Sequence, residues 1–139
     1  MDKYKEIRPV VLGVVRNGDK ILVSTGYDEI KKQSFYRCIG GGIEFLEKSQ
    51  DALKREFKEE LGIDVKVKEY LGLTENIFVY NGKNAHELIF LYNVSINKKD
   101  IKEQYHILDE VESDAIWVDA EKFKNKELIL YPELVIKYL

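Results

Sequence analysis

The chain contains very little cysteine or proline. Cys38 is its only cysteine among 139 residues, so no disulfide can form within the chain, and a reducing compartment is favoured. Pro9 and Pro132 are its only prolines, and no stretch rich in proline, glycine or serine marks a linker. We therefore expect one domain over residues 1–139.

Long apolar runs and a strong excess of one charge are also missing. No segment reaches the roughly 20 apolar residues that a membrane-spanning helix needs, and residues 1–6 do not have the apolar core of a secretory signal. The formal net charge is −3, which gives no bulk attraction to nucleic acid. We expect a cytoplasmic protein with no membrane or DNA partner, and RNA binding is disfavoured.

Most of the chain shows the patterns of β-strands. Apolar and β-branched segments predict strands at residues 10–15, 20–23, 35–39, 65–79 with a break near Gly72, 87–96 and 115–118. Asn17-Gly18 and Asn81-Gly82 predict tight turns between strands. The glycines at residues 40–42 predict a turn, and the polar residues 97–110 predict a loop.

One segment has the period of an amphipathic helix. Leu53, Phe57 and Leu61 recur every four residues and predict a helix over residues 50–61. Ser49 is the expected N-cap, and Gly62 stands where a left-handed residue ends a helix. Short helices are expected at residues 120–125 and 132–138. This order predicts an α/β (α+β) fold, with a mixed sheet covered by helices on both faces.

Three carboxylates lie on one face of the expected helix. Glu56, Glu59 and Glu60 stand at i, i+3 and i+4, where like charges repel each other, and the C-terminal end of a helix is unfavourable for anions. A hard divalent cation would compensate, and Mg²⁺ binds through a few carboxylates together with substrate phosphates. The alternative is a solvated charged face paired with nearby lysines and Arg55.

These acids belong to a longer pattern, which can be written G-x5-E-x7-R-E-U-x-E-E-x-G-U. Here x is any residue and U is a bulky apolar residue. The pattern is filled by Gly41, Glu47, Arg55, Glu56, Phe57, Glu59, Glu60, Gly62 and Ile63. The pattern resembles the Nudix box at every defined position. Three neighbouring positions depart from the family: Ile39 replaces the usual proline, Leu46 a frequent glycine, and Lys48 the serine or threonine that often caps the helix.

The resemblance implies a Nudix-type α/β/α sandwich around a mixed sheet and a pyrophosphohydrolase of the MutT-like kind. It implies one to three Mg²⁺ or Mn²⁺ ions on Glu56, Glu59, Glu60 and the carbonyl of Gly40. Arg55 would orient the glutamates, and Glu47 would stabilise the junction between loop and helix. The general base would be Glu56 or a glutamate outside the box. Glu87 is the candidate outside the box, as base or as an extra metal ligand, and a surface position on its strand is the alternative.

The resemblance further implies that the substrate is a nucleoside diphosphate linked to a group X, such as a nucleoside triphosphate, including oxidised ones, a dinucleoside polyphosphate or a nucleotide sugar. Arg37 is a candidate for gripping a phosphate, although a surface ion pair explains it equally well. Tyr36 or Phe35 is a candidate for stacking on a base, with a core position as the alternative for each. Tyr80 stands at about the distance from the box at which some dinucleoside polyphosphate hydrolases carry a tyrosine.

Two other functions fit the same resemblance. One is a nucleotide-sensing domain that binds without hydrolysis, which usually shows eroded box acids, whereas the acids here are intact. The other is an RNA 5′-end pyrophosphohydrolase, which would want a basic channel that the acidic composition does not favour. The sequence also leaves open whether the chain forms a homodimer.

Overall fold

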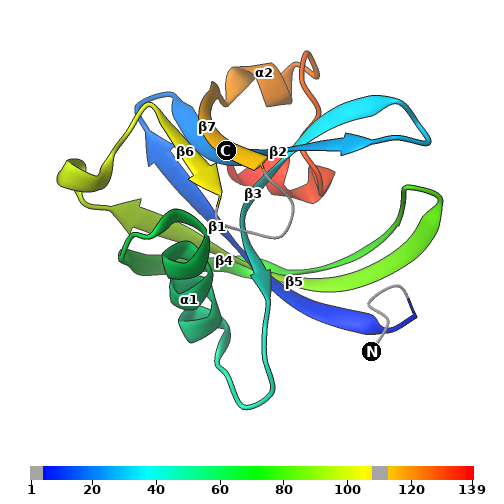
Figure 1. The fold of residues 1–139 in the computed structure, drawn as a ribbon, viewed down its shortest axis with the longest axis horizontal. Helices are drawn as coiled ribbons and strands as arrows, with labels where there is room; N and C mark the ends of the chain where they lie inside the picture. Colours follow the sequence, from blue (N-terminus) through cyan, green and yellow to red (C-terminus); the bar gives the residue numbers. More distant parts are fainter. Residues whose placement is uncertain (1–4, 108–112) are drawn as a thin grey trace.

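A computed structural model of the chain describes residues 5–107 and 113–139. Within these residues, seven strands form one mixed sheet in the order β4-β5-β1-β3-β2-β7-β6 (Figure 1). They are β1 (Ile7–Asn17), β2 (Lys20–Asp28), β3 (Gln33–Gly42), β4 (Val65–Tyr80), β5 (Lys83–Ile96), β6 (Gln104–Ile107) and β7 (Ser113–Asp119). β1 pairs in parallel with β5 and antiparallel with β3, so the predicted mixed sheet is confirmed.

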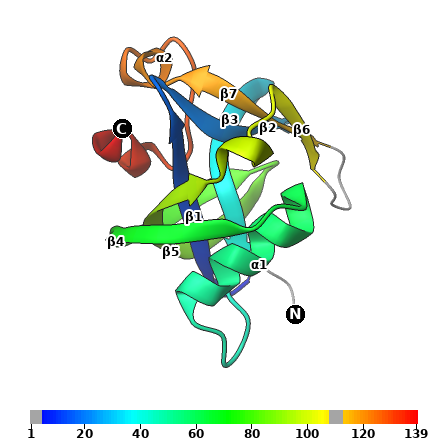
Figure 2. The same ribbon diagram turned by 90° about the vertical axis from the view of Figure 1, so that its left-hand side faces the viewer.

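Helices cover both faces of this sheet, as the pattern predicted. α1 (Ser49–Leu61) lies against one face, and α2 (Glu121–Lys124) lies on the other side together with the 3₁₀ helix η2 (Glu133–Tyr138), as Figure 2 shows. A further 3₁₀ turn, η1 (Lys98–Asp100), follows β5. No helix among the described residues is long and apolar enough to cross a membrane.

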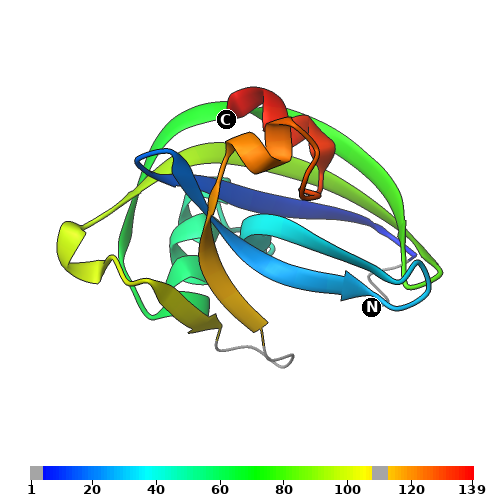
Figure 3. The same ribbon diagram turned by 90° about the horizontal axis from the view of Figure 1, so that it is seen from above.

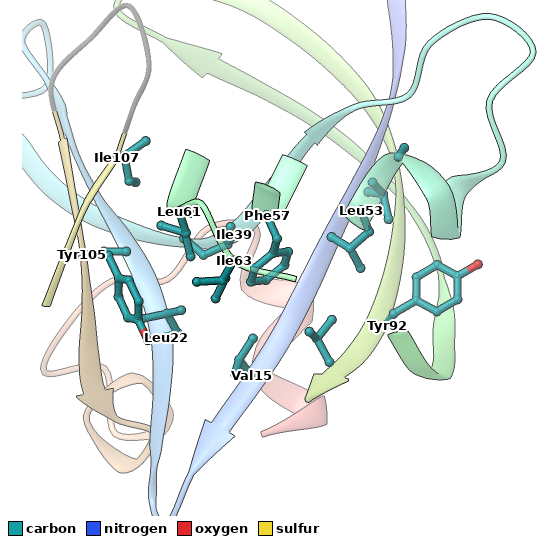
Figure 4. Close-up of a cluster of buried hydrophobic side chains, with 14 residues drawn as sticks. Val15, Leu22, Ile39, Leu53, Phe57, Leu61, Ile63, Tyr92, Tyr105 and Ile107 are labelled. Carbon is teal, nitrogen blue, oxygen red and sulfur yellow. The ribbon is translucent and has the colours of Figure 1, made fainter. Parts of the chain in front are cut away.

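The core is divided between the two faces. On the α1 side, Leu53 and Phe57 are fully buried against Val15, Ile39 and other strand residues (Figure 4). On the opposite side, buried residues of β1 and β2 pack with Phe123 of α2 and with Leu130 and Val135 near the C-terminus. β1 is buried on both faces, which explains its unbroken apolar run in place of an alternating one.

The ends of α1 confirm one prediction and correct another. Gly62 ends the helix in the left-handed conformation, with φ 71°, and its N–H donates to the carbonyl of Lys58. Ser49 is already helical, and Lys48 holds the cap position without a side-chain hydrogen bond. The Ser49 hydroxyl is instead 2.7 Å from the hydroxyl of Tyr92 on β5. A tertiary hydrogen bond has therefore replaced the local cap.

Two segments expected to be irregular are strands. Gly40, Gly41 and Gly42 form the end of β3, in register with Leu12, Val11 and Val10 of β1. In the expected loop 97–110, β6 forms because Tyr105 and Ile107 alternate into the core and the strand pairs with β7. Residues 108–110 of that loop lie outside the described residues.

Candidate functional site

A cleft of about 1520 Å³ opens between the outer parts of two hairpins, β2–β3 and β4–β5. Both hairpins extend to the same side of the molecule (Figure 3). The cleft lining contains Gly40, Gly41, Gly42, Glu56, Glu59, Glu60, Arg37, Glu87 and Tyr80 among its residues. The fold thus brings the three acids of α1 to one cleft together with the glycine run and the off-box candidates.

Residues 40–42 of β3 must be free of side chains for the site to form. A Cβ on Gly40 would lie 1.9 Å from the carbonyl oxygen of Val11, and φ of Gly40 is +158°. A Cβ on Gly41 would lie 2.5 Å from the carboxyl carbon of Glu56. Only glycine therefore allows the main chain of β3 to touch both β1 and the first carboxylate of the set.

Arg55 lies at the centre of the acids. Its Nη1 is 3.0 Å from an oxygen of Glu56 and 3.2 Å from an oxygen of Glu59, and its Nη2 donates to the carbonyl of Gly42 at 2.9 Å. Glu47 accepts both Nε, at 2.8 Å, and Nη2, at 2.9 Å. This guanidinium joins the loop before α1, the helix itself and the end of β3.

The Arg55–Glu47 pair is bidentate, the strongest geometry for such a pair. Hydrogen bonds from Arg55, together with the N–H of Glu44, lower the pKa of Glu47 to about 2. Hydrogen bonding to Glu47 in turn raises the pKa of Arg55. Leu46, beside Glu47, has φ 70°, a conformation that glycine adopts more easily, and its side chain is exposed.

The donor set fits a hard divalent cation. Glu56, Glu59 and Glu60 supply carboxylate oxygens, and the main chain of Gly40 lines the same cleft. Residues of this kind suit Mg²⁺ or Mn²⁺. Among residues 5–107 and 113–139, no three His, Cys, Asp or Glu side chains are gathered as a finished metal cage. Here Arg55 bridges Glu56 and Glu59, and the Glu59 side chain is 59% exposed.

Glu87 has its own partners inside the cleft. It is 6% exposed, Arg37 donates to its Oε1 at 2.8 Å, and Nη1 of Arg8 is 3.7 Å from its Oε2. Sequence reasoning missed Arg8, because only the parallel register of β1 and β5 places it opposite Glu87. One oxygen of Glu87 thus accepts a hydrogen bond from Arg37, and the other lies within ion-pair distance of Arg8.

The aromatic candidates fall in different places. Tyr36 packs its ring against Phe123, with centroids 5.7 Å apart, on the α2 side of the sheet. Tyr80 lines the cleft, in edge contact with Phe35 at 5.8 Å. Phe35 also contacts Tyr131, at 5.5 Å, a residue that no local pattern had indicated. Phe35, Tyr80 and Tyr131 form the aromatic part of the lining.

The tips of the two hairpins are tied together. The N–H of Asn81 donates to Asp28 at 3.1 Å, and the side chain of Asn81 accepts from the N–H of Glu29 at 2.8 Å. Lys31 Nζ adds a bond to the carbonyl of Val79 at 2.9 Å. Asp28 is buried, and amide donors, first that of Lys31, lower its pKa. These contacts close the outer end of the cleft.

Known proteins share this architecture. The MutT protein from Bacillus halodurans has a TM-score of 0.66 at 21% identity, over 94% of this chain and 80% of that chain. A NUDIX hydrolase from Nitrosomonas europaea gives 0.63 at 20% identity, over 95% and 85%. The ORF135 protein of E. coli gives 0.61 at 22% identity, over 94% and 84%. At these identities the likeness concerns the fold.

A comparison of this chain with curated proteins found no match. The protein-family model for the NUDIX domain matches residues 6–137, which is nearly the whole chain. That match includes the box on β3 and α1, every strand of the sheet and the cleft. The chain belongs to the Nudix family.

Proposed function

We propose that the chain is a Mg²⁺- or Mn²⁺-dependent hydrolase that cleaves a phosphoanhydride bond in a small nucleotide. The observation that carries the proposal is the convergence of Glu56, Glu59 and Glu60 with the glycine end of β3 in one cleft. The cleft also contains aromatic side chains that suit a base and arginines that suit phosphates. The family membership supports the same reaction class.

Glu56, Glu59, Glu60 and the carbonyl of Gly40 are the residues that would hold the metal. When bound, such an ion polarises phosphoryl oxygens and lowers the pKa of a coordinated water. The absence of a side chain at Gly41 leaves room for the Glu56 carboxylate beside the main chain of β3. Arg55 holds Glu56 and Glu59 at the same edge of α1 and pairs with Glu47.

Glu56 is the general base in this proposal. It touches the glycine strand, so a water held against that strand lies within reach of its carboxylate for proton removal. Glu87 is less suited to this work because it is buried between Arg37 and Arg8, which lie 2.8 and 3.7 Å from its two oxygens. The contacts of Glu87 instead suit the positioning of the arginines.

The test is turnover of a panel of nucleotides with Mg²⁺ by the Glu59→Gln and Glu60→Gln variants. Each change keeps the shape of the side chain and removes a charged ligand, so we expect kcat/KM to fall on the order of 100-fold or more. Glu103→Gln, at an exposed position directly before β6 and outside the cleft lining, is the matched control and should keep wild-type activity. Wild-type rates in both cleft variants would exclude this assignment of the metal ligands.

A further inference from the structure

A second charged group, separate from the box acids, lies in the cleft. It consists of Glu87 on β5, Arg8 on β1 and Arg37 on β3. The side chain of Glu87 is 7% exposed, that of Arg37 25% and that of Arg8 39%. The carboxylate is therefore buried beneath two guanidiniums that reach solvent inside the cleft.

The charges of this group do not cancel. Burial of a carboxylate is costly unless it is paired, so the arginines satisfy Glu87. One carboxylate neutralises only one of two guanidiniums, which leaves a net charge of about +1 at physiological pH. The third cation of the described lining, Lys31, already donates to the carbonyl of Val79. The excess positive charge thus lies at Arg8 and Arg37.

Arg8 and Glu56 lie on opposite sides of the end of β3. A Cβ on Gly41 would meet the carboxylate of Glu56 at 2.5–2.7 Å, and a Cβ on Gly42 would meet Nη2 of Arg8 at 2.9 Å. Successive residues of a strand face opposite ways. Residue 41 therefore faces an acidic side with Glu56, residue 42 faces Arg8, and Glu56, Arg8 and Arg37 all line the same cleft.

We propose that Arg8 and Arg37 bind a phosphate of the substrate beyond the bond that is cleaved, and that Glu87 is their positioning residue. The inference rests on the proposed function and specifies its substrate. A guanidinium donates as a rigid fork that matches phosphate oxygens. A chain of three or more phosphates, as in a nucleoside triphosphate or dinucleoside polyphosphate, can reach both the acidic side and the arginines. A diphosphate joined to an uncharged sugar leaves the arginines without an anion.

The first test measures binding and does not depend on hydrolysis. Inorganic tripolyphosphate is titrated calorimetrically into the protein in EDTA. Wild type is expected to bind it more tightly than pyrophosphate, and Arg8→Gln and Arg37→Gln should each raise its Kd roughly tenfold or more. Arg16→Gln removes the same charge from β1 outside the cleft lining and should change the Kd less than about twofold.

The second test uses the active enzyme with Mg²⁺. Arg37→Gln should lower kcat/KM for a nucleoside triphosphate by at least roughly tenfold, mainly through KM, while a nucleotide sugar is affected far less. Arg37→Lys, which keeps the charge and loses the fork, should recover part of the loss. Thermal unfolding of each variant checks that it is folded.

The two proposals fail in different ways. If the wild type turns over no nucleotide, the proposed function falls while the titration in EDTA still reports on the arginines. The arginine site is refuted alone if the wild type hydrolyses nucleotides but binds tripolyphosphate no more tightly than pyrophosphate. It is also refuted alone if Arg8→Gln and Arg37→Gln bind tripolyphosphate as tightly as the wild type. Equal losses for triphosphate and nucleotide sugar would likewise refute it.

Discussion

Among the single residues that the structure describes, Arg55 forms ion pairs with four acidic side chains, and these contacts order the acids of the box. It reaches Glu47, Glu56, Glu59 and the carbonyl of Gly42 from one guanidinium. Lysine could not replace it, since one ammonium does not span that fork of acceptors. The charge of Arg55 also reduces the repulsion among carboxylates that would otherwise oppose their gathering on α1.

Glu47 should make stability depend on pH in an acid window. Its pKa is lowered from 4.5 to about 2 in the folded chain, so its stabilising contribution is present above pH 4.5 and is lost as the pH falls from about 4.5 toward 2. Glu47→Gln should therefore flatten the decline of the urea midpoint between pH 5 and pH 3. A decline as steep as that of wild type would show that other acids cause it.

Among the elements, the end of β3 is the one on which the cleft most depends. Its last residues complete the ladder with β1 and at the same time provide the surface against which Glu56 and Arg8 lie. A side chain here would disturb both the pairing with β1 and the packing of Glu56 of α1 against the strand.

Gly40→Ala should destabilise the fold by about 3 kcal/mol or more, because the added Cβ overlaps the carbonyl oxygen of Val11 at 1.9 Å. Gly18 is the matched control. Its φ is +62°, but a Cβ there meets nothing within 4 Å, so Gly18→Ala should cost only about 1 kcal/mol from its left-handed backbone. Urea unfolding of both variants gives the comparison, and equal losses would contradict the steric argument.

Across the whole molecule, the cleft is closed by contacts between segments far apart in the chain. Asp28 is the last residue of β2 and Glu29 follows it, whereas Asn81 joins β4 to β5. Asn81 has φ 49°, which suits the tight turn that the Asn-Gly pair predicted. The same residue thus shapes one hairpin and ties it to the other.

Asn81→Gly keeps a residue that tolerates this backbone and removes the acceptor for the N–H of Glu29. We expect the amide of Glu29 to exchange with deuterium roughly tenfold faster or more, while amides within α1 keep their wild-type rates. Unchanged exchange at Glu29 would mean that the hairpin tips are held together without this contact. The α1 amides serve as the internal control for global stability.

Local chemistry made much of this molecule predictable. The stripe of Leu53, Phe57 and Leu61 predicted α1, and Gly62 marked its end, since both depend on residues a few positions apart. Tertiary partners explain the errors. Ser49 bonds to Tyr92 and does not cap the helix, and residues 40–42 pair with β1 and do not turn.

The sequence by itself determined the family, the sheet with helices on both faces and the set of box acids, because these follow from short-range spacing and apolar period. Only the tertiary structure decided that Arg8, Arg37 and Glu87 meet, and that Tyr36 lies away from the cleft. Those contacts depend on the register between β1 and β5 and on the change of partner along β3, from β2 to β1. Such long-range pairings leave no mark in the local order of residues.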